Sequence, residues 1–426
     1  MPGRPLGAAT SNASLIAKLA AAAWSLGKPF FPLDPALPAA TKRDLLAQAG
    51  ADLVVGDGDV AGFAMLPCAA AAAAQSASIA APCASDDVAL IIATSGSTGD
   101  PKAVMLTHAN LAAAVRCSAA RTPLGAGDRW LACLPLYHIG GFSILTRCAE
   151  AGATAVLTSR FEPDAILDRL RQDAISHLSL VPGMLGQLMG ASHGPAPPSL
   201  RHVLVGGAAL APSLAEKARS QGWPIQPTYG MSETASQVAT LACLPPDWQA
   251  GHVGKPLPGI EVALDGDQRL KVRGPVVMAG YANPNLRPGD GLAEGWLVTS
   301  DIAEISSEGD LRIIGRADDV IVSGGKKVHP AAVERLLEAC PGVLEARIAG
   351  RSDQVWGDTV VAIFSGSAGP DDLIGWAREN LPPAWRPRRA VKVEALPRLS
   401  NGKPDRSALR KLAEGLDAET SATGQP

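Results

Sequence analysis

The sequence contains no apolar run long enough to cross a bilayer, no stripe of basic residues and no cysteines at the spacing of a metal site. Because a spanning helix needs about 20 consecutive apolar residues, we expect no membrane span. The formal net charge of −3 does not indicate a nucleic-acid partner. The seven scattered cysteines are an odd number, which argues against a secreted disulfide framework. We therefore expect a cytoplasmic protein.

The composition is that of a globular protein, with 47% hydrophobic and 19% charged residues, and 426 residues are enough for one to three domains. A run near the start, SLIAKLAAAAWSLGKPFF, has the apolar character of a signal peptide. Lys18 interrupts its apolar part and no clear cleavage site follows. We therefore interpret it as a helix that ends just before Gly27.

From Val88 to about Glu233, strand-like runs alternate with helix-like runs. We expect strands at 88–93, 153–159, 176–182 and 200–207, and helices at 108–120, 162–174, 183–190 and 212–222. Thr107 is a suitable N-cap for the first of these helices. Alternation of this kind predicts an α/β fold with mostly parallel sheets covered by helices.

The pattern changes after residue 250. Short strands at 260–266, 269–275 and 311–316, separated by glycine and aspartate turns, predict a small antiparallel or barrel-like unit. From Asp319 an α+β pattern begins, with elements at 330–340 (helix), 343–350 and 358–364 (strands), 371–381 (helix) and 389–396 (strand). We expect a large N-terminal domain at 1–317, a small C-terminal domain at 318–413 and a tail at 414–426.

A loop from Thr94 to Lys102, TSGSTGDPK, follows the first expected strand of this region and precedes its first helix. Its glycines, hydroxyls and single cation suit an anion nest, in which several backbone N–H groups turn toward a phosphate. The Walker pattern does not match, because Lys102 follows Pro101 and precedes Ala103. A flexible polar loop is the alternative, but the ordered string is more specific than that.

The loop resembles the phosphate loop of the adenylate-forming superfamily, which includes acyl- and aryl-CoA ligases, adenylation domains and firefly luciferase. Six further strings follow in that superfamily's order and span nearly the whole chain: PLYHIGG, VGGAAL, TYGMSET, TSD, GRADDVIVSGGKKVHP and PRLSNGKPDR. Within the superfamily, three strings are most similar to the o-succinylbenzoate–CoA ligases of menaquinone synthesis: PLYHIGGFSIL, YGMSETASQ and VGKPLPG.

The resemblance implies an ATP-dependent acid–CoA ligase that uses Mg²⁺. In such enzymes a carboxylate attacks the α-phosphorus of ATP, pyrophosphate leaves, and the thiol of CoA then displaces AMP from the acyl-adenylate. Because the first step brings an anion toward a polyanion, catalysis depends on positioning and charge neutralisation. The expected partners are a small carboxylic acid, ATP and CoA, and a homodimer is left open.

Three alternatives also stay open. The acid is another aryl or fatty acid, the thiol belongs to a carrier protein, or the chain is a catalytically inactive acyl- or nucleotide-binding protein. Retention of Lys403, Glu233, Asp301 and the complete phosphate loop argues against the third alternative.

The resemblance also implies a nucleotide site. The β- and γ-phosphates are assigned to Thr94, Ser95, Gly96, Ser97, Thr98, Gly99 and, unless it is only solvated, Lys102. Tyr229 offers a flat face to adenine. Other residues of this site are Gly206, Gly207, Ala208, Gly230 and Thr234. Asp301 accepts the ribose hydroxyls, Arg316 makes a second ribose or phosphate contact, and Glu233 supplies a hard oxygen for Mg²⁺.

Lys403 is implied as the adenylation lysine, whose cation bridges the carboxylate and the α-phosphate. His138 is implied as an aromatic gate that admits or blocks pantetheine. A general base, or a histidine of the core or surface, is the alternative for that position. The acyl pocket is assigned to His138, Gly141, Ser143, Val205, Gly230, Met231 and Ser236.

The string SGGKKVHP departs from the commoner Gly-Gly-Glu-Asn form. The resemblance implies that Gly324 and Gly325 line a pantetheine tunnel, whereas Lys326 and Lys327 either contact CoA phosphates or face water. Asp318 lies where the superfamily places the hinge of a mobile C-terminal domain. Because LGKPFFPLDPALP begins at Leu26, the N-terminal subdomain is expected to be shorter than in relatives.

Overall fold

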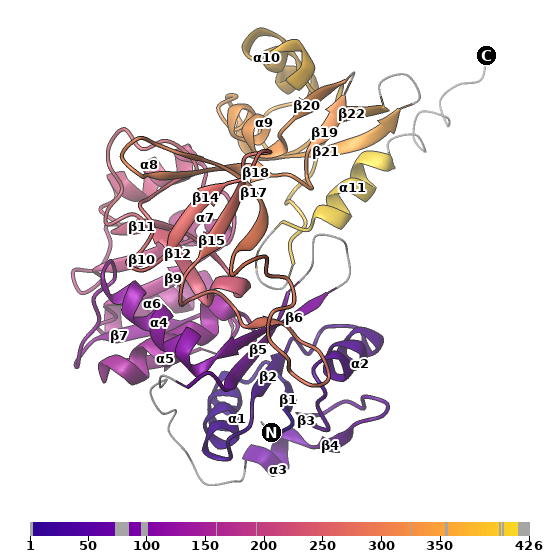
Figure 1. Ribbon diagram of the computed structural model, residues 1–426. Coiled ribbons are helices and arrows are strands. Elements are labelled where there is room, and N and C mark those ends of the chain that lie inside the picture. The colour runs from indigo at the N-terminus through magenta and orange to yellow at the C-terminus, as the bar shows by residue number, and fades with distance from the viewer. Residues whose placement is uncertain are drawn as a thin grey trace.

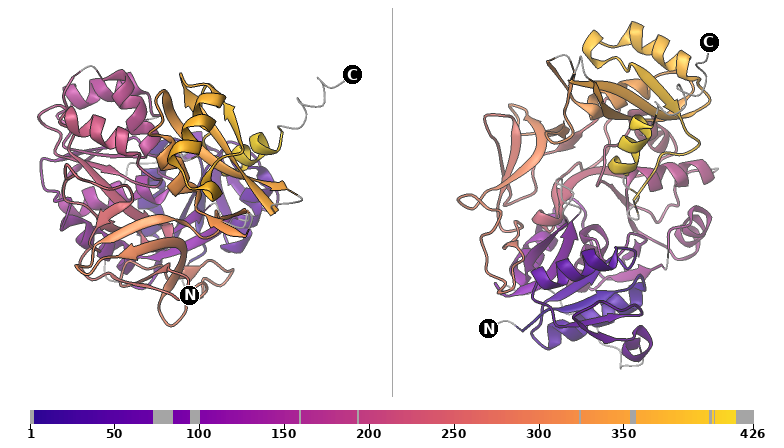
Figure 2. Two further views of the ribbon diagram at one scale, coloured as in Figure 1. Left: turned by 90° about the horizontal axis from the view of Figure 1, so that it is seen from above. Right: turned by 90° about the vertical axis from the view of Figure 1, so that its right-hand side faces the viewer.

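The computed structural model describes residues 3–72, 85–94, 101–158, 160–192, 194–323, 325–353, 357–399, 402 and 404–415. Within these residues the chain forms four β-sheets with helices on their faces. The first sheet lies at one end of the molecule and the C-terminal unit at the other (Figures 1 and 2). No helix in the described part of the chain combines the length and the apolar character that crossing a membrane requires.

The first sheet has the strand order β16-β6-β5-β2-β1-β3-β4. Its strands are β1 (Leu6–Ala9), β2 (Phe30–Leu33), β3 (Leu53–Gly56), β4 (Ala64–Leu66), β5 (Val88–Thr94), β6 (Lys102–Thr107) and β16 (Gly280–Tyr281). Its helices are α1 (Ala13–Ser25), α2 (Ala39–Gln48) and α3 (Cys68–Ala72). The pairs among β1 to β5 are parallel, whereas β6 and β16 are antiparallel to their neighbours. The helix expected near the start is confirmed as α1.

The strand β6 is not among the expected elements. Its residues, KAVMLT, run without a turn residue into the N-cap of the next helix, so periodicity does not separate strand from helix there. The string TSGSTGDPK therefore connects two antiparallel strands and does not lead directly into a helix.

The second sheet has the order β12-β11-β10-β9-β7-β8 and is parallel except for β12. Its strands are β7 (Arg129–Ala132), β8 (Thr154–Leu157), β9 (His177–Leu180), β10 (His202–Val205), β11 (Ile225–Met231) and β12 (Ser236–Thr240). The helices are α4 (His108–Ala119), α5 (Ile139–Ala151), α6 (Pro163–Gln172), α7 (Pro182–Ala191) and α8 (Pro212–Ser220), with a short 3₁₀-helix η1 at Ser232–Thr234. The α/β prediction for this region is confirmed, including Thr107 as N-cap, whose hydroxyl accepts from the Asn110 N–H at 3.0 Å.

The main core lies between these two sheets, where α4 and α5 pack against both. Phe30 and Leu106 of the first sheet, Leu111 and Phe142 of the helices, and Trp130 of the second sheet belong to one buried cluster. The opposite face of the second sheet is covered by α6, α7 and α8, and that of the first sheet by α2. The two sheets therefore enclose α4 and α5 and share one core.

The third sheet is the small β unit expected after residue 250. It is antiparallel with the order β13-β18-β17-β15-β14. Its strands are β13 (His252–Gly254), β14 (Glu261–Leu264), β15 (Arg269–Arg273), β17 (Leu297–Ile305) and β18 (Leu311–Arg316).

The C-terminal unit is a sheet of order β20-β19-β22-β21, with β23 paired to β22. Its elements are β19 (Ile321–Ser323), β20 (Lys326–Val328), α9 (Pro330–Leu337), β21 (Val343–Asp353), β22 (Gly357–Gly366), α10 (Pro370–Asn380), η2 (Pro383–Trp385), β23 (Arg389–Lys392) and α11 (Arg406–Glu414). Helices α9 and α10 pack on one core and α11 on another. The boundary at 317/318 stays a prediction, and it falls between the end of β18 and the start of β19. Residues 416–426 of the expected tail lie outside the described residues.

Candidate active site

A pocket opens at the carboxyl ends of the parallel strands of the second sheet, where ligands of open α/β sheets usually bind. We call it the main pocket. Its walls come from the ends of β7, β9, β10 and β11, from the start of α5, and from the turn between β11 and β12. The residues that line it are Leu134, Pro135, His138, Ile139, Gly140, Gly141, Arg147, Ser179, Leu180, Val181, Leu204, Gly206, Gly207, Thr228, Gly230, Met231, Ser232, Ser236 and Gln237.

Most residues expected for the acyl pocket meet here, namely His138, Gly141, Gly230, Met231 and Ser236. Ser143 and Val205 are not among the lining residues. Ser143 is buried in α5, where its hydroxyl donates to the Gly140 carbonyl at 3.4 Å. Val205 faces the core on the α6–α8 side of the second sheet, because strand residues alternate between faces and its neighbour Leu204 faces the pocket.

His138 ends the segment before α5, at the N-cap position, and its ring lies 4.9 Å from that of Tyr137 in an edge-to-face arrangement. The side chain is half-buried and lines the main pocket. A gate is compatible with this position, and that role stays a proposal.

Two glycines of the site are required by the protein's own packing. A Cβ on Gly206 would lie 2.7 Å from the Thr228 carbonyl oxygen, and a Cβ on Gly230 would overlap the Ser236 carbonyl. The strand ends β10 and β11 and the turn after β11 therefore approach too closely for any side chain. Packing within the protein is therefore enough to require glycine at both positions. The absence of side chains there also keeps this side of the pocket open.

The expected ribose contacts form a connected group. The Tyr229 hydroxyl donates to Asp301 Oδ2 at 2.5 Å, and Arg316 Nη1 lies 3.6 Å from Asp301 Oδ1. Burial, reinforced by the Asp301 carboxylate, raises the pKa of Tyr229 well above its usual range, so this hydroxyl stays a donor. Arg316 also donates to both carboxylate oxygens of Asp318, the proposed hinge residue, at 2.9 and 2.8 Å.

We expect Asp301→Ala to weaken ATP binding by about 1–3 kcal/mol, because ribose hydroxyls lose a charged acceptor. Tyr229→Phe is the matched control, since it keeps the ring and removes the hydrogen bond to Asp301. Calorimetry should show a loss for the alanine variant that exceeds the loss for the phenylalanine variant. Unchanged nucleotide affinity in the alanine variant would remove Asp301 from the site.

Glu233 lies in η1, and its carboxylate meets the first sheet through Tyr281, which the sequence analysis did not single out. The Tyr281 hydroxyl donates to Glu233 Oε1 at 3.2 Å, and the Lys102 ammonium lies 4.8 Å from the centre of the Tyr281 ring. Tyr281 reaches both because β16 pairs with β6, and the Met278 N–H donates to the Glu233 carbonyl at 2.8 Å. The three side chains thus lie beside the base of the β5–β6 hairpin.

The Glu233 carboxylate fits a Mg²⁺ ion that also binds nucleotide phosphates. Within the described part of the chain Oε2 accepts no hydrogen bond, and a hard oxygen is the ligand that Mg²⁺ prefers. The described residues contain no group of three His, Cys, Asp or Glu side chains that would hold a metal alone. A Mg²⁺ ion here would therefore take most of its ligands from substrate phosphates and water.

Tyr281→Phe should raise the Mg²⁺ concentration for half-maximal activity roughly 10-fold, the scale reported for partners that orient a metal ligand. The ring under Lys102 remains in this variant, so the change isolates the hydroxyl. A Mg²⁺ titration of ATP turnover measures it. An unchanged requirement would mean that Tyr281 does not orient Glu233.

The remaining expected site residues lie elsewhere or are not described. Those outside the described residues are Ser95, Gly96, Ser97, Thr98, Gly99, Gly324 and Lys403. Thr94 and Lys102 pair at the base of the hairpin, and the Thr94 hydroxyl donates to the Lys102 carbonyl at 3.3 Å. Thr234 is buried, and its hydroxyl accepts from the Met231 N–H and donates to the Met231 carbonyl at the start of η1. Ala208 follows the end of β10. Gly325 is exposed at the turn between β19 and β20, and Lys326 and Lys327 are exposed in β20.

A residue that the sequence analysis missed completes the main pocket. Arg147 of α5 is only 4% exposed, its Nη2 donates to the Ser236 hydroxyl at 3.2 Å, and its guanidinium lies 5.3 Å from the Trp130 ring. Among the described residues no carboxylate pairs with it. Burial lowers the pKa of Arg147 to about 10, so the charged form is held at a cost. Burying a cation without a carboxylate partner is costly, and an anion in the main pocket would offset that cost.

The chain matches two protein-family models. Residues 16–282 match the model described as AMP-binding enzyme, and residues 332–403 match the AMP-binding enzyme C-terminal domain.

Curated relatives include 2-succinylbenzoate–CoA ligases of Bacillus mycoides and Bacillus cytotoxicus. Both are 34% identical to this chain. The first match covers 78% of this chain and 71% of the relative, and the second 76% and 70%.

Similar solved structures include o-succinylbenzoate CoA synthetase (MenE) of Bacillus subtilis in two complexes. The complex with the acyl-adenylate intermediate OSB-AMP gives a TM-score of 0.84 at 28% identity, covering 96% of this chain and 88% of that chain. The complex with ATP and magnesium ion also gives 0.84 at 28% identity, with 96% and 89% coverage. ATP-bound MatB of Rhodopseudomonas palustris shares the fold, with a TM-score of 0.86 at 24% identity and 98% and 90% coverage.

Proposed function

This chain belongs to the family of AMP-binding enzymes, and we propose that it is an ATP-dependent ligase that joins 2-succinylbenzoate to CoA in menaquinone synthesis. The names of its relatives support 2-succinylbenzoate as the acid and CoA as the thiol. The observation on this chain that carries the proposal is the buried Arg147 in the main pocket.

2-Succinylbenzoate has two carboxylates, one on the ring and one on the succinyl chain. Only one of them is activated, so the other enters the main pocket as an anion. A buried anion needs a partner, and the unpaired guanidinium of Arg147 provides a charge-assisted, bidentate match for a carboxylate. Benzoate and simple fatty acids have no second carboxylate and would leave Arg147 unpaired.

In the first half-reaction an oxygen of the activated carboxylate forms a bond to the α-phosphorus of ATP, and the bond to pyrophosphate breaks. Asp301 and Tyr229 hold the nucleoside, and Glu233 would hold a Mg²⁺ ion, which would supply positive charge against the phosphates. Lys403 neutralises charge between the carboxylate and the α-phosphate. The protein's contribution is orientation and charge compensation, as expected for phosphoryl chemistry without a protein nucleophile.

In the second half-reaction the CoA sulfur forms a bond to the acyl carbon, the thiol loses its proton and AMP leaves. His138 lines the main pocket, and this position supports its assignment as a gate for the incoming thiol. A carrier-protein thiol is the second candidate acceptor, because the exposed Lys326 and Lys327 suit the phosphates of either acceptor.

The deciding experiment is AMP release by the purified chain with a panel of acids, with and without free CoA. 2-Succinylbenzoate should exceed benzoate and long-chain fatty acids in kcat/KM, and release should depend on CoA. A clear preference for a fatty acid would assign the chain to another acyl-CoA ligase, and release that needs a carrier protein would assign it to the carrier-loading enzymes.

We also propose a cytoplasmic location and leave homodimerisation as a proposal. The six cysteines in the described part of the chain are free thiols, as in a reducing compartment. Fractionation of the source cells tests the location, and sedimentation of the purified chain tests the dimer.

A further inference from the structure

Arg398 and Gly402, which precede Lys403 in the sequence, lie against the first turn of α7. A Cβ built on Gly402 would lie 2.8 Å from Cγ2 of Val181, a residue of the main pocket wall. A Cβ built on Gly183 would lie 2.5 Å from Nη1 of Arg398 and 2.7 Å from its Cζ. The Arg398 guanidinium therefore occupies the space that a side chain at position 183 would need.

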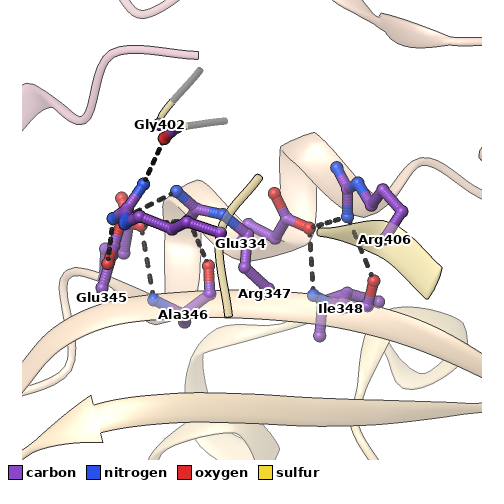
Figure 3. Close-up of polar contacts among 9 residues, drawn as sticks. Glu334, Glu345, Ala346, Arg347, Ile348, Gly402 and Arg406 are labelled. Atoms are coloured by element: carbon purple, nitrogen blue, oxygen red, sulfur yellow. Dashed lines mark hydrogen bonds and ion pairs between the residues drawn. The ribbon is translucent and has the colours of Figure 1, made fainter. Parts of the chain in front are cut away.

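Arg398 is held by an ion pair of the C-terminal unit, and Figure 3 labels two of its partners, Glu345 and Gly402. Its Nη2 lies 2.6 Å from Glu345 Oε1 and 2.7 Å from Oε2, and its Nη1 donates to the Gly402 carbonyl at 3.0 Å. Glu345 is fixed in turn by Arg347 of β21, whose Nη2 lies 3.0 Å from Oε1 and which is only 9% exposed. Arg398 thus connects β21 to the residue that precedes Lys403.

The other end of the segment is also tied to the C-terminal unit. Arg406 Nη1 lies 2.7 Å from Glu334 Oε1, and its Nη2 lies 3.6 Å from Asp319 Oδ2. The Asp405 N–H donates to the Pro397 carbonyl at 2.9 Å. Arg406 is therefore tied to the C-terminal unit, and Arg398 and Gly402 meet the N-terminal part at α7.

We infer that Arg398 is a positioning residue for adenylation, and that Gly183 is the surface against which it docks. The inference rests on the proposed function, because adenylation is the half-reaction assigned to Lys403. Lys403 is joined to Gly402 by one peptide bond, so fixing Gly402 limits where the lysine reaches. A rotation of the C-terminal unit about the proposed hinge at Asp318 would separate Arg398 from Gly183, so the contact would belong to one half-reaction only.

The test uses Gly183→Ala in the full chain, with Gly190→Ala as the matched control on the same helix. A Cβ at Gly190 meets nothing within 4 Å, so both changes favour the helix and only one displaces Arg398. With Gly183→Ala, ATP–pyrophosphate exchange with 2-succinylbenzoate should fall at least 10-fold. Transfer from supplied acyl-adenylate to CoA should stay within about twofold of the unmodified protein, and Gly190→Ala should leave both rates unchanged.

Arg398→Gln and Glu345→Gln test the other side of the contact and should show the same loss confined to adenylation. Combining Gly183→Ala with Arg398→Gln should cost no more than Arg398→Gln alone, because the clash needs both partners. Equal damage to both half-reactions, or additive losses in the double variant, would overturn the positioning role.

Amide hydrogen exchange without substrates tests the contact independently of activity. Gly183→Ala should speed exchange of the Gly402 amide, which donates to the Leu399 carbonyl at 2.9 Å, and Gly190→Ala should not. Unchanged exchange in Gly183→Ala would contradict the contact. If the unmodified protein activated none of the acids, the proposed function would be wrong. The amide hydrogen exchange result would still decide whether Arg398 contacts Gly183.

Discussion

Replacing Arg147 with methionine should lower kcat/KM for 2-succinylbenzoate roughly 30-fold to several thousand-fold. This corresponds to a loss of about 2–5 kcal/mol of binding free energy, the usual effect of removing one partner of a buried charged pair. The side chain lies in the main pocket, is 4% exposed and has no carboxylate partner among the described residues. Its only described polar partner is the Ser236 hydroxyl, so the second carboxylate of the substrate would be its counter-ion.

A monocarboxylic substrate is the control for this variant. 4-Oxo-4-phenylbutanoate and 2-butanoylbenzoate are analogues that each lack one of the two carboxylates. Whichever analogue the unmodified enzyme still activates should be used about equally well by the unmodified protein and the variant. Since methionine removes an unpaired buried charge, the melting temperature of Arg147→Met should not fall. An equal loss with the dicarboxylic substrate and the analogue would mean that Arg147 does not recognise a second carboxylate.

Lys403→Ala should reduce adenylation by roughly 10²–10³-fold, the effect of removing one preorganised charge-stabilising donor. Transfer from a supplied acyl-adenylate to CoA should largely survive, because the charge at the α-phosphate has then already been neutralised. Asp318→Pro should show the opposite pattern, since the proline ring fixes φ at the proposed hinge and resists domain rotation. Single-turnover assays of each half-reaction measure both variants.

The structure gives this prediction a specific control. Asp318 receives two hydrogen bonds from Arg316, at 2.9 and 2.8 Å, so proline there removes a carboxylate as well as backbone freedom. Asp318→Ala removes only the carboxylate, and it should leave thioester formation closer to normal than the proline variant does. If both Lys403→Ala and Asp318→Pro damaged the two steps equally, a two-state domain rotation would be wrong.

The α/β architecture was predictable because its cues are local. The alternation of strands and helices from Val88 to Glu233 and the N-cap at Thr107 depend on neighbours in sequence. The strings that resemble the superfamily also indicated Tyr229, Glu233 and Asp301 as one site. The structure joins Tyr229 to Asp301 by a hydrogen bond and joins Glu233 to Tyr281, and the shared site and the catalytic roles remain predictions.

Other parts of the site depend on packing that local pattern does not contain. Arg147 lies within an ordinary helical run, ILTRCAEA, and its burial arises only because α5 is enclosed between two sheets. Tyr281 belongs to a two-residue strand that becomes significant when it pairs with β6. The contact of Arg398 with Gly183 joins positions that are far apart in sequence and lie in different units.

The most direct measurement of the central claim is a single-turnover reaction of the unmodified chain with ATP, Mg²⁺ and 2-succinylbenzoate, analysed by mass spectrometry before and after CoA is added. The account predicts pyrophosphate and the 2-succinylbenzoyl adenylate before CoA, and AMP with the CoA thioester after it. Absence of the adenylate, while another acid gives both products, would contradict the proposed substrate. Adenylate that persists in the presence of CoA would contradict the proposed acceptor.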